Sequence, residues 1–296
     1  MIVLALVPAV LGLLIGSFLN VVVYRVPNGL SIVSPPSACP SCNNEIKSYD
    51  NIPVLSWLLL RGKCRNCKAP ISLRYPFVEA GTALLFVGVA AWWISSSALV
   101  EHVETGLASL MQTGMLFLGA DAPTGREFFA AVLILVAFLY LAAVSIALAL
   151  IDLDVHRLPN AIVLPSYIVA AVLLGAASLL NGDFEALLRG SIGLVILWVA
   201  YLLMALAYPG GMGFGDVKLA GVLGLYLGYL GWGELAIGAF AAFLLGGLFA
   251  IGLVVVKRVG RKSGIPFGPW MLGGAWIGIF FGNWVWSGYL SLIGLS

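Results

Sequence analysis

The stretch FFAAVLILVAFLYLAAVSIALALI, residues 128–151, contains no charged side chain and runs directly into the charged sequence DLDVHRLPN, residues 152–160. A helix needs about 20 apolar residues to cross the hydrocarbon core of a bilayer, and this stretch is long enough. Charged side chains are costly inside the hydrocarbon core, so the helix should reach the membrane surface near Asp152. We therefore expect a membrane-spanning helix with an aspartate at one end.

The composition of the whole chain is that of a protein that crosses the membrane several times. Of its 296 residues, 61% are hydrophobic and 9% are charged, whereas soluble domains carry about 25% charged residues. A soluble fold of this length would lack polar surface, so the bilayer must act as solvent for much of the chain. We predict an all-α polytopic membrane protein with about eight transmembrane helices, near residues 2–24, 77–99, 128–151, 161–181, 189–208, 217–233, 236–256 and 270–292.

The first apolar run, residues 2–24, could instead be a cleaved secretory leader. It lacks the basic start and the small-residue cleavage site that such leaders carry, so we interpret it as the first transmembrane helix. An even number of helices puts both termini on one side, and basic loops stay in the cytoplasm. Thirteen of the fifteen Lys and Arg residues then fall on one side. This predicts periplasmic termini, an acidic outer loop at 100–127, and cytoplasmic loops at 25–76, 152–160, 209–218 and 257–269.

All four cysteines lie in the loop 25–76, in the sequences CPSC (39–42) and CRNC (64–67). The loop is too short to bury a sufficient core alone, and two Cys-x-x-Cys pairs 21 residues apart can close a tetrahedral zinc site. Four thiolates leave no open coordination position, so the zinc would be structural. Two disulfides or a redox dithiol are the alternatives, and a reducing cytoplasm disfavours the disulfides. The predicted ligands are Cys39, Cys42, Cys64 and Cys67.

Two aspartates from distant parts of the chain are expected at the same membrane depth. Asp152 ends one predicted helix and Asp216 begins another, just after Gly213 and Gly215, which allow close backbone approach. Two carboxylates in a partly dry cleft would share a proton, so that one acts as base toward water and the other as acid toward a carbonyl. Helix capping is the simpler alternative, and it suits Asp154 best. Neither histidine, His102 or His156, has a convincing nucleophile partner.

Taken together and in order, these motifs resemble those of the type IV prepilin leader peptidases, which belong to the GxGD class of membrane aspartic proteases. The resemblance covers nearly the whole chain. The residues that carry it are GSFLNVVVYRVP (16–27), the paired CPSC and CRNC, NIPVLSWLLLRGKC (51–64), ISLRYPFVEAGTA (71–83), IDLDVHRLPN (151–160), GMGFGDVKLA (211–220) and IPFGP (265–269).

The resemblance implies a bifunctional enzyme of the bacterial inner membrane. Asp152 and Asp216 match the catalytic pair and the four cysteines match the tetracysteine motif. The implied substrates are prepilins or pseudopilins of type IV pilus and type II secretion systems, cleaved after a glycine at the cytoplasmic face. The new N-terminus is then methylated from S-adenosylmethionine. Gly213, Gly215 and Lys218 are the expected substrate-binding residues.

The binding site for S-adenosylmethionine has no sequence motif of its own, because no glycine-rich fingerprint follows a strand. By resemblance we expect it beside the cysteine loop, at Gly62, Lys63, Arg74 and Glu79. As alternatives, Gly62 is a turn residue and Arg74 an interfacial anchor.

We expect three parts: a first helix at 1–24, a tetracysteine domain associated with methylation at 25–76, and a seven-helix protease domain at 77–296. Membrane lipid is an expected partner and nucleic acid is not, while the oligomeric state is left open. The alternative functions are a proton-coupled transporter with interfacial aspartates and a non-enzymatic scaffold.

Overall fold

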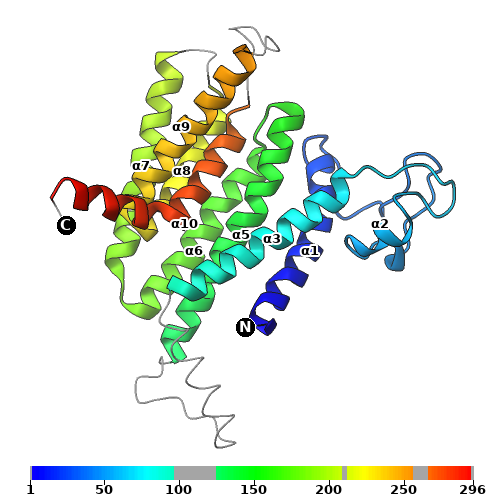
Figure 1. The fold of residues 1–296 in the computed structure, drawn as a ribbon, viewed down its shortest axis with the longest axis horizontal. Helices are drawn as coiled ribbons and strands as arrows, with labels where there is room; N and C mark the ends of the chain where they lie inside the picture. The colour runs from blue at the N-terminus through cyan, green and yellow to red at the C-terminus, as the bar shows by residue number, and fades with distance from the viewer. Residues whose placement is uncertain (1, 97–124, 209–211, 256–265, 295–296) are drawn as a thin grey trace, which may run out of the picture. The chain divides into compact units, whose positions relative to one another are not determined.

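The computed structural model describes residues 2–96, 125–208, 212–255 and 266–294, and the chain is helical through most of these ranges (Figure 1). The described residues contain no β-strand, only two isolated bridges. Within the described residues, nearly all of each predicted apolar run is helical, and the run 217–233 is divided at Gly231 between α8 and α9, so the all-α prediction is confirmed. The elements are α1 (Ile2–Arg25), η1 (Ser48–Asp50), α2 (Leu55–Leu59), α3 (Arg74–Ser96), α5 (Gly125–Val155), α6 (Asn160–Asn181), α7 (Phe184–Ala207), α8 (Phe214–Leu230), α9 (Trp232–Val255) and α10 (Gly268–Leu292).

The predicted count of about eight spans is not confirmed. Among the described residues, six helices are long and apolar enough to cross a membrane: α1, α3, α5, α6, α7 and α9. Helix α8 has only 17 residues and carries Asp216 and Lys218 in its first turns, and α10 is not among the six. Most of the predicted outer loop, with Glu101, His102, Glu104 and Asp121, lies outside the described residues, as do the basic residues 257–262.

The chain divides into two compact units. The first contains the residues up to Phe128 together with Phe138–Ala147, and the second contains Phe129–Ala137 and the residues from Leu148 onward. In the first unit, α1 packs along α3. A methyl group on Gly12 would lie 2.5 Å from the Cα of Ala83, so the two backbones are nearly in contact.

The cysteine loop between α1 and α3 is fixed at both ends. Arg25, the last residue of α1, donates hydrogen bonds to the carbonyls of Ser31 (2.9 Å) and Pro35 (2.7 Å). Glu79, in the second turn of α3, accepts one from the Val54 N–H at 2.7 Å. The loop is therefore bound to the two helices that it connects.

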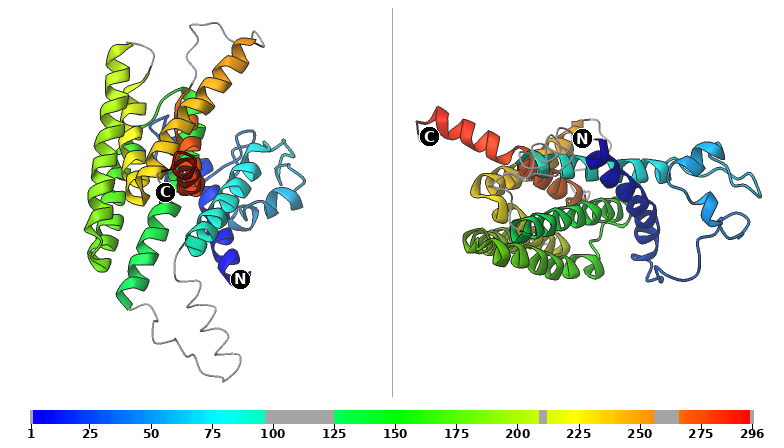
Figure 2. Two further views of the ribbon diagram at one scale, coloured as in Figure 1. Left: turned by 60° about the vertical axis from the view of Figure 1, so that its left-hand side comes forward. Right: turned by 90° about the horizontal axis from the view of Figure 1, so that it is seen from below.

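Helix α8 is the centre of the second unit. It contacts α6, α7, α9 and α10, and nearly all its residues from Asp216 to Tyr229 are buried. Helix α7 packs against α8, and the left view of Figure 2 shows the two helices side by side. A methyl group on Gly193 of α7 would lie 2.5 Å from the carbonyl oxygen of Gly224 in α8. Small residues thus let the two helices approach closely, as is common in membrane proteins.

Candidate active site and metal centre

Asp152 lies in the last turn of α5 and is 5% exposed. Its Oδ2 accepts a hydrogen bond from the backbone N–H of Gly268, the first residue of α10, at 3.0 Å. An N–H at the start of a helix has no partner within the helix. The bond therefore satisfies both a buried carboxylate and a buried helix end.

Asp216 is the third residue of α8 and is 9% exposed. Its Oδ2 accepts a hydrogen bond from the N–H of Gly213, the residue that caps the helix, at 3.1 Å. The capping role that the sequence offers as the simpler alternative is therefore real. It does not exclude a second role, because the carboxylate also interacts electrostatically with Asp152.

Leu158, in the short link between α5 and α6, ties the surroundings of the two aspartates together. A methyl group on Gly215 would lie 3.0 Å from its Cβ, and one on Gly268 would lie 3.3 Å from its Cδ2. The two glycine backbones therefore lie against the same side chain. The structure brings the predicted pair, Asp152 and Asp216, into one site.

The other residues predicted near this site take different positions. Lys218 donates a hydrogen bond to the Asn160 side chain at 3.0 Å and so connects α8 to the start of α6. Asp154 and His156 are exposed, and His156, directly after the end of α5, has a positive φ of 54°. Binding of substrate by Lys218, Gly213 and Gly215 stays a prediction.

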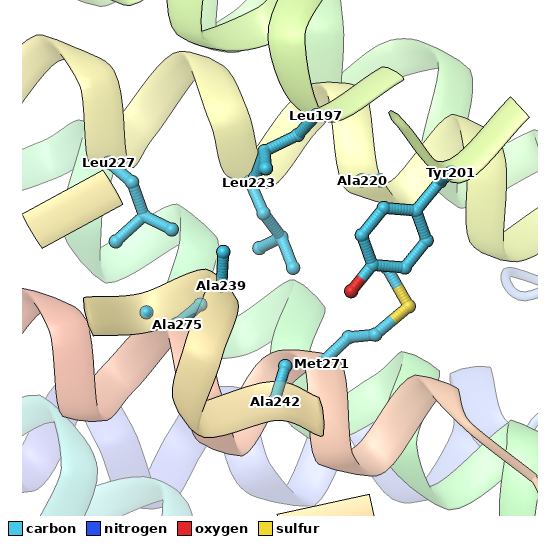
Figure 3. Close-up of a pocket in the computed structure, with 10 residues that line it drawn as sticks. Leu197, Tyr201, Ala220, Leu223, Leu227, Ala239, Ala242, Met271 and Ala275 are labelled. Atoms are coloured by element: carbon cyan, nitrogen blue, oxygen red, sulfur yellow. The ribbon is translucent and has the colours of Figure 1, made fainter. Parts of the chain in front are cut away.

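Tyr201 of α7 is a buried neighbour of this site that the sequence analysis missed. It is 3% exposed and interacts electrostatically with Asp216. Its ring borders a cavity of about 10 Å³ between α7, α8, α9 and α10, next to Met271 (Figure 3). That volume suffices for about one water molecule, so the cavity cannot hold a peptide. In an apolar span, nothing in the sequence distinguishes Tyr201 from a packing residue.

The four cysteines form a cluster whose geometry suits a metal ion. Their sulfur atoms all lie within 4.8 Å of one another, and the sulfurs of Cys39 and Cys67 are 3.8 Å apart. A tetrahedral site with Zn–S bonds of about 2.3 Å has sulfur–sulfur distances of about 3.8 Å. The cluster can therefore hold a metal ion.

The two cysteine pairs have the same backbone conformation. The Cys39 N–H bonds the carbonyl of Asn44, and the Cys64 N–H bonds that of Ala69. The residue after each second cysteine, Asn43 or Lys68, has a positive φ. Two equivalent turns thus present their sulfurs to one point.

The backbone also prepares the thiols for metal binding. The N–H groups of Ser41 and Cys42 point at the Cys39 sulfur and lower the pKa of its thiol to about 6. At Cys42 the N–H of Asn44 acts in the same direction, but burial and the neighbouring cysteine sulfurs outweigh it and raise the pKa to about 11. Of these two thiols, Cys39 therefore loses its proton more easily than Cys42.

An ion pair holds the second cysteine turn from outside. Arg65, between Cys64 and Cys67, binds both carboxylate oxygens of Asp50 at 2.6–3.0 Å. These hydrogen bonds hold the pKa of Asp50 below its usual range. The guanidinium also lies 5.5 Å from the centre of the Tyr49 ring. The pair therefore links the two halves of the cysteine loop.

The residues predicted to bind the methyl donor have varied surroundings. Glu79 is 8% exposed and bonded to Val54, at the start of α2. Gly62, beyond the end of α2, has a φ of 67° and lies under the Trp57 ring, which agrees with a turn residue. Lys63 and Arg74 are exposed. Their role toward a cofactor stays a prediction.

Two family models match separate parts of the chain. The bacterial peptidase A24 N-terminal domain matches residues 10–93, and the type IV leader peptidase family matches residues 128–251. The chain belongs to the type IV leader peptidase family. The predicted resemblance is thereby confirmed. The first range contains the four cysteines, and the second contains both aspartates.

Relatives in this family match nearly the whole chain. A protein of Aeromonas hydrophila named prepilin leader peptidase/N-methyltransferase is 34% identical, with 95% of this chain and 91% of the relative covered. Proteins with the same name from Pseudomonas aeruginosa and Neisseria gonorrhoeae are 31% and 34% identical, over 97% and 93% of this chain and 93% and 89% of their own. No solved structure matches the chain.

Proposed function

We propose that this protein is a prepilin leader peptidase and N-methyltransferase in which Asp152 and Asp216 form the catalytic pair. The observation that carries the proposal is that both carboxylates are buried beside glycines, Gly268 and Gly215, that lie against the same Leu158 side chain. The two aspartates come from segments 64 residues apart in the sequence. The names of the relatives support both activities.

The pair suits hydrolysis of a peptide bond by an activated water. One carboxylate takes a proton from water as the water oxygen bonds to the scissile carbonyl carbon. The other, protonated, aspartate donates to the carbonyl oxygen, and the departing amine takes up a proton as the C–N bond breaks. Two neighbouring carboxylates favour a singly protonated pair, so one base and one acid are available together.

The surroundings of Asp216 suit a substrate that enters as extended chain. Gly213 and Gly215 add no side chains of their own beside Asp216, and Phe214 between them is 64% exposed. We propose that the site lies at the cytoplasmic surface of the inner membrane. The basic leader of a prepilin or pseudopilin would stay in the cytoplasm, while its apolar helix remains in the bilayer. A glycine before the scissile bond would let the two backbones approach closely.

We propose that the four cysteines hold a structural zinc ion, which would tie the two halves of the cysteine loop together. Bound S-adenosylmethionine would supply the methyl group for the new N-terminal amine. We place its binding beside this loop, at Gly62, Lys63, Arg74 and Glu79. Within that group, Glu79 also anchors the loop through Val54.

Cleavage of a prepilin by the purified protein tests the proposal. Asp152→Asn and Asp216→Asn keep the size of each side chain but remove the acid and the base, so each should abolish cleavage while the protein still accumulates in the membrane. Asp154→Asn, at an exposed position two residues from Asp152, is the matched control and should cleave normally. Persistent cleavage by either of the first two variants would rule out the mechanism.

A further inference from the structure

We infer that Gly268, in the sequence PFGP (266–269), is a positioning residue that fixes the Asp152 carboxylate for cleavage. The inference rests on the proposed function of Asp152. It concerns a residue outside both ranges that the family models match. Gly268 lies 116 residues from Asp152 in the sequence, yet their atoms are hydrogen-bonded.

A buried hydrogen bond joins Gly268 to Asp152. The Gly268 N–H donates to Asp152 Oδ2 at 3.0 Å, and both groups are buried. The N-terminal end of a helix carries partial positive charge, so α10 stabilises a carboxylate at this point. Loss of the bond would deprive the buried Gly268 N–H and the buried Asp152 Oδ2 of this hydrogen bond.

The space around Gly268 is too small for a side chain. A methyl group there would lie 2.8 Å from Asp152 Oδ2, 3.3 Å from its Cγ, and 3.3 Å from Leu158 Cδ2. Any side chain would therefore make Asp152 turn or α10 move. Glycine is the residue that permits this hydrogen bond at this distance.

Asp216 is held in the same way by Gly213, whose N–H donates to its Oδ2. Each carboxylate thus has one oxygen fixed by a glycine N–H. In the proposed reaction, the other oxygen, Oδ1, is then the one that serves water or the scissile carbonyl. Catalysis by a carboxylate pair depends on such fixed orientation.

The start of α10 is held in turn by an aromatic cluster. The Phe267 ring lies 5.5 Å from that of Phe243 in α9 and 6.3 Å from that of Tyr201 in α7. A methyl group on Gly246 of α9 would lie 2.7 Å from Cε2 of Phe267. A change at Gly246 should therefore displace Phe267, and with it the neighbouring Gly268 N–H.

The first test compares Gly268→Ala with Gly273→Ala, on the same helix, where a methyl group meets only Leu245 at an ordinary 3.4 Å. We expect Gly268→Ala to lower kcat for prepilin cleavage about a hundredfold, because small misplacements cost that much. KM should stay within about twofold, because substrate contacts are unchanged. Methylation of an already cleaved peptide should equal that of the wild type, while the Tm should fall because a buried hydrogen bond is lost. Gly273→Ala should behave as wild type throughout.

If Gly268→Ala does not fold, two variants of α9 test the inference in its place. Gly246→Ala should lower kcat about tenfold at unchanged KM, while Gly247→Ala, where a methyl group has open space, should not. Normal kcat in Gly268→Ala, or equal kcat in the two α9 variants, would overturn the inference. Absence of cleavage by the wild-type protein would instead overturn the proposed function.

Discussion

At the scale of single residues, each of the two aspartates is held by a backbone N–H group, that of Gly268 for Asp152 and that of Gly213 for Asp216. Lys218, two residues beyond Asp216, is bonded to Asn160. A cation bound to either carboxylate would favour the doubly ionised pair. Neutral donors fix the orientation of the carboxylates and still leave their mutual repulsion to favour a shared proton.

Zinc binding should depend steeply on pH. Binding needs thiolates, and the pKa values of about 6 for Cys39 and about 11 for Cys42 mean that between these values the metal displaces the Cys42 proton. Affinity should therefore fall by at least about tenfold for each pH unit below neutral, because every protonated thiol must lose its proton to the metal, and more steeply below pH 6, where Cys39 is protonated as well. Competition with a chelator from about pH 5 to about pH 8 measures the zinc affinity.

The matched variants for this prediction lie in one turn. Cys39→Ser should remove the bound zinc, whereas Ser41→Ala keeps the backbone N–H that points at the Cys39 sulfur and should retain it. Metal analysis of protein purified without chelator gives the occupancy. A pH-independent affinity, or full occupancy in Cys39→Ser, would contradict the four-thiolate site.

At the scale of elements, the contact between α7 and α8 should tolerate no added methyl group. On Gly224 such a group would collide with the carbonyl oxygen of Gly193, and overpacking costs about 1–3 kcal/mol. Gly224→Ala should therefore lower the Tm in detergent. Gly175→Ala in α6, where a methyl group has open space, is the control and should leave the Tm equal or higher. Equal Tm values for both variants would show that the helices can separate freely.

Glu79 should matter more for anchoring the cysteine loop than its place in α3 suggests. Its carboxylate accepts the Val54 N–H at 2.7 Å, and hydrogen bonds to charged groups contribute about 1.5–3 kcal/mol. Glu79→Ala should therefore make trypsin cleave the loop at Arg61 and Lys63 about tenfold faster. Glu45→Ala, at an exposed position in the same loop, should not. Equal digestion rates would mean that the loop is held elsewhere.

The positions of the helices along the chain were predictable from the sequence, whereas the packing of one helix against another was not. Uncharged runs such as 128–151 can only be helical in a bilayer, and charged boundaries placed Asp152 and Asp216 near helix ends. The contact between Gly268 and Asp152 depends on which helices lie side by side, and apolar spans carry no pattern for that. The quoted IPFGP was the one signal that pointed toward Gly268.

At the scale of the whole molecule, the described residues of the two compact units separate the proposed activities. Both aspartates and Gly268 lie in the second unit, and all four cysteines lie in the first. The N-terminal family match, residues 10–93, likewise takes in α1, the cysteine loop and most of α3. The division at residue 76 stays a prediction, and the units favour grouping α3 with the loop.

The site geometry also argues that α8 crosses the membrane despite its 17 residues. Asp152 ends α5, Asp216 begins α8 and Gly268 begins α10, so these three helix ends share one depth. Helix α8 therefore leads away from the site, and α9 must return the chain to it. Four surrounding helices shield α8 from lipid, so it needs less apolar length than an exposed span.

A topology measurement can check this argument. A green fluorescent protein fused after Val255, the end of α9, should fluoresce, because that protein folds in the cytoplasm. Alkaline phosphatase, which is active in the periplasm, should be active when fused after Leu292. If α8 did not cross, α9 would end on the opposite side, and the Val255 fusions would show phosphatase activity without fluorescence. That result would separate Asp152 from Gly268 by the full thickness of the bilayer, which their hydrogen bond at 3.0 Å forbids.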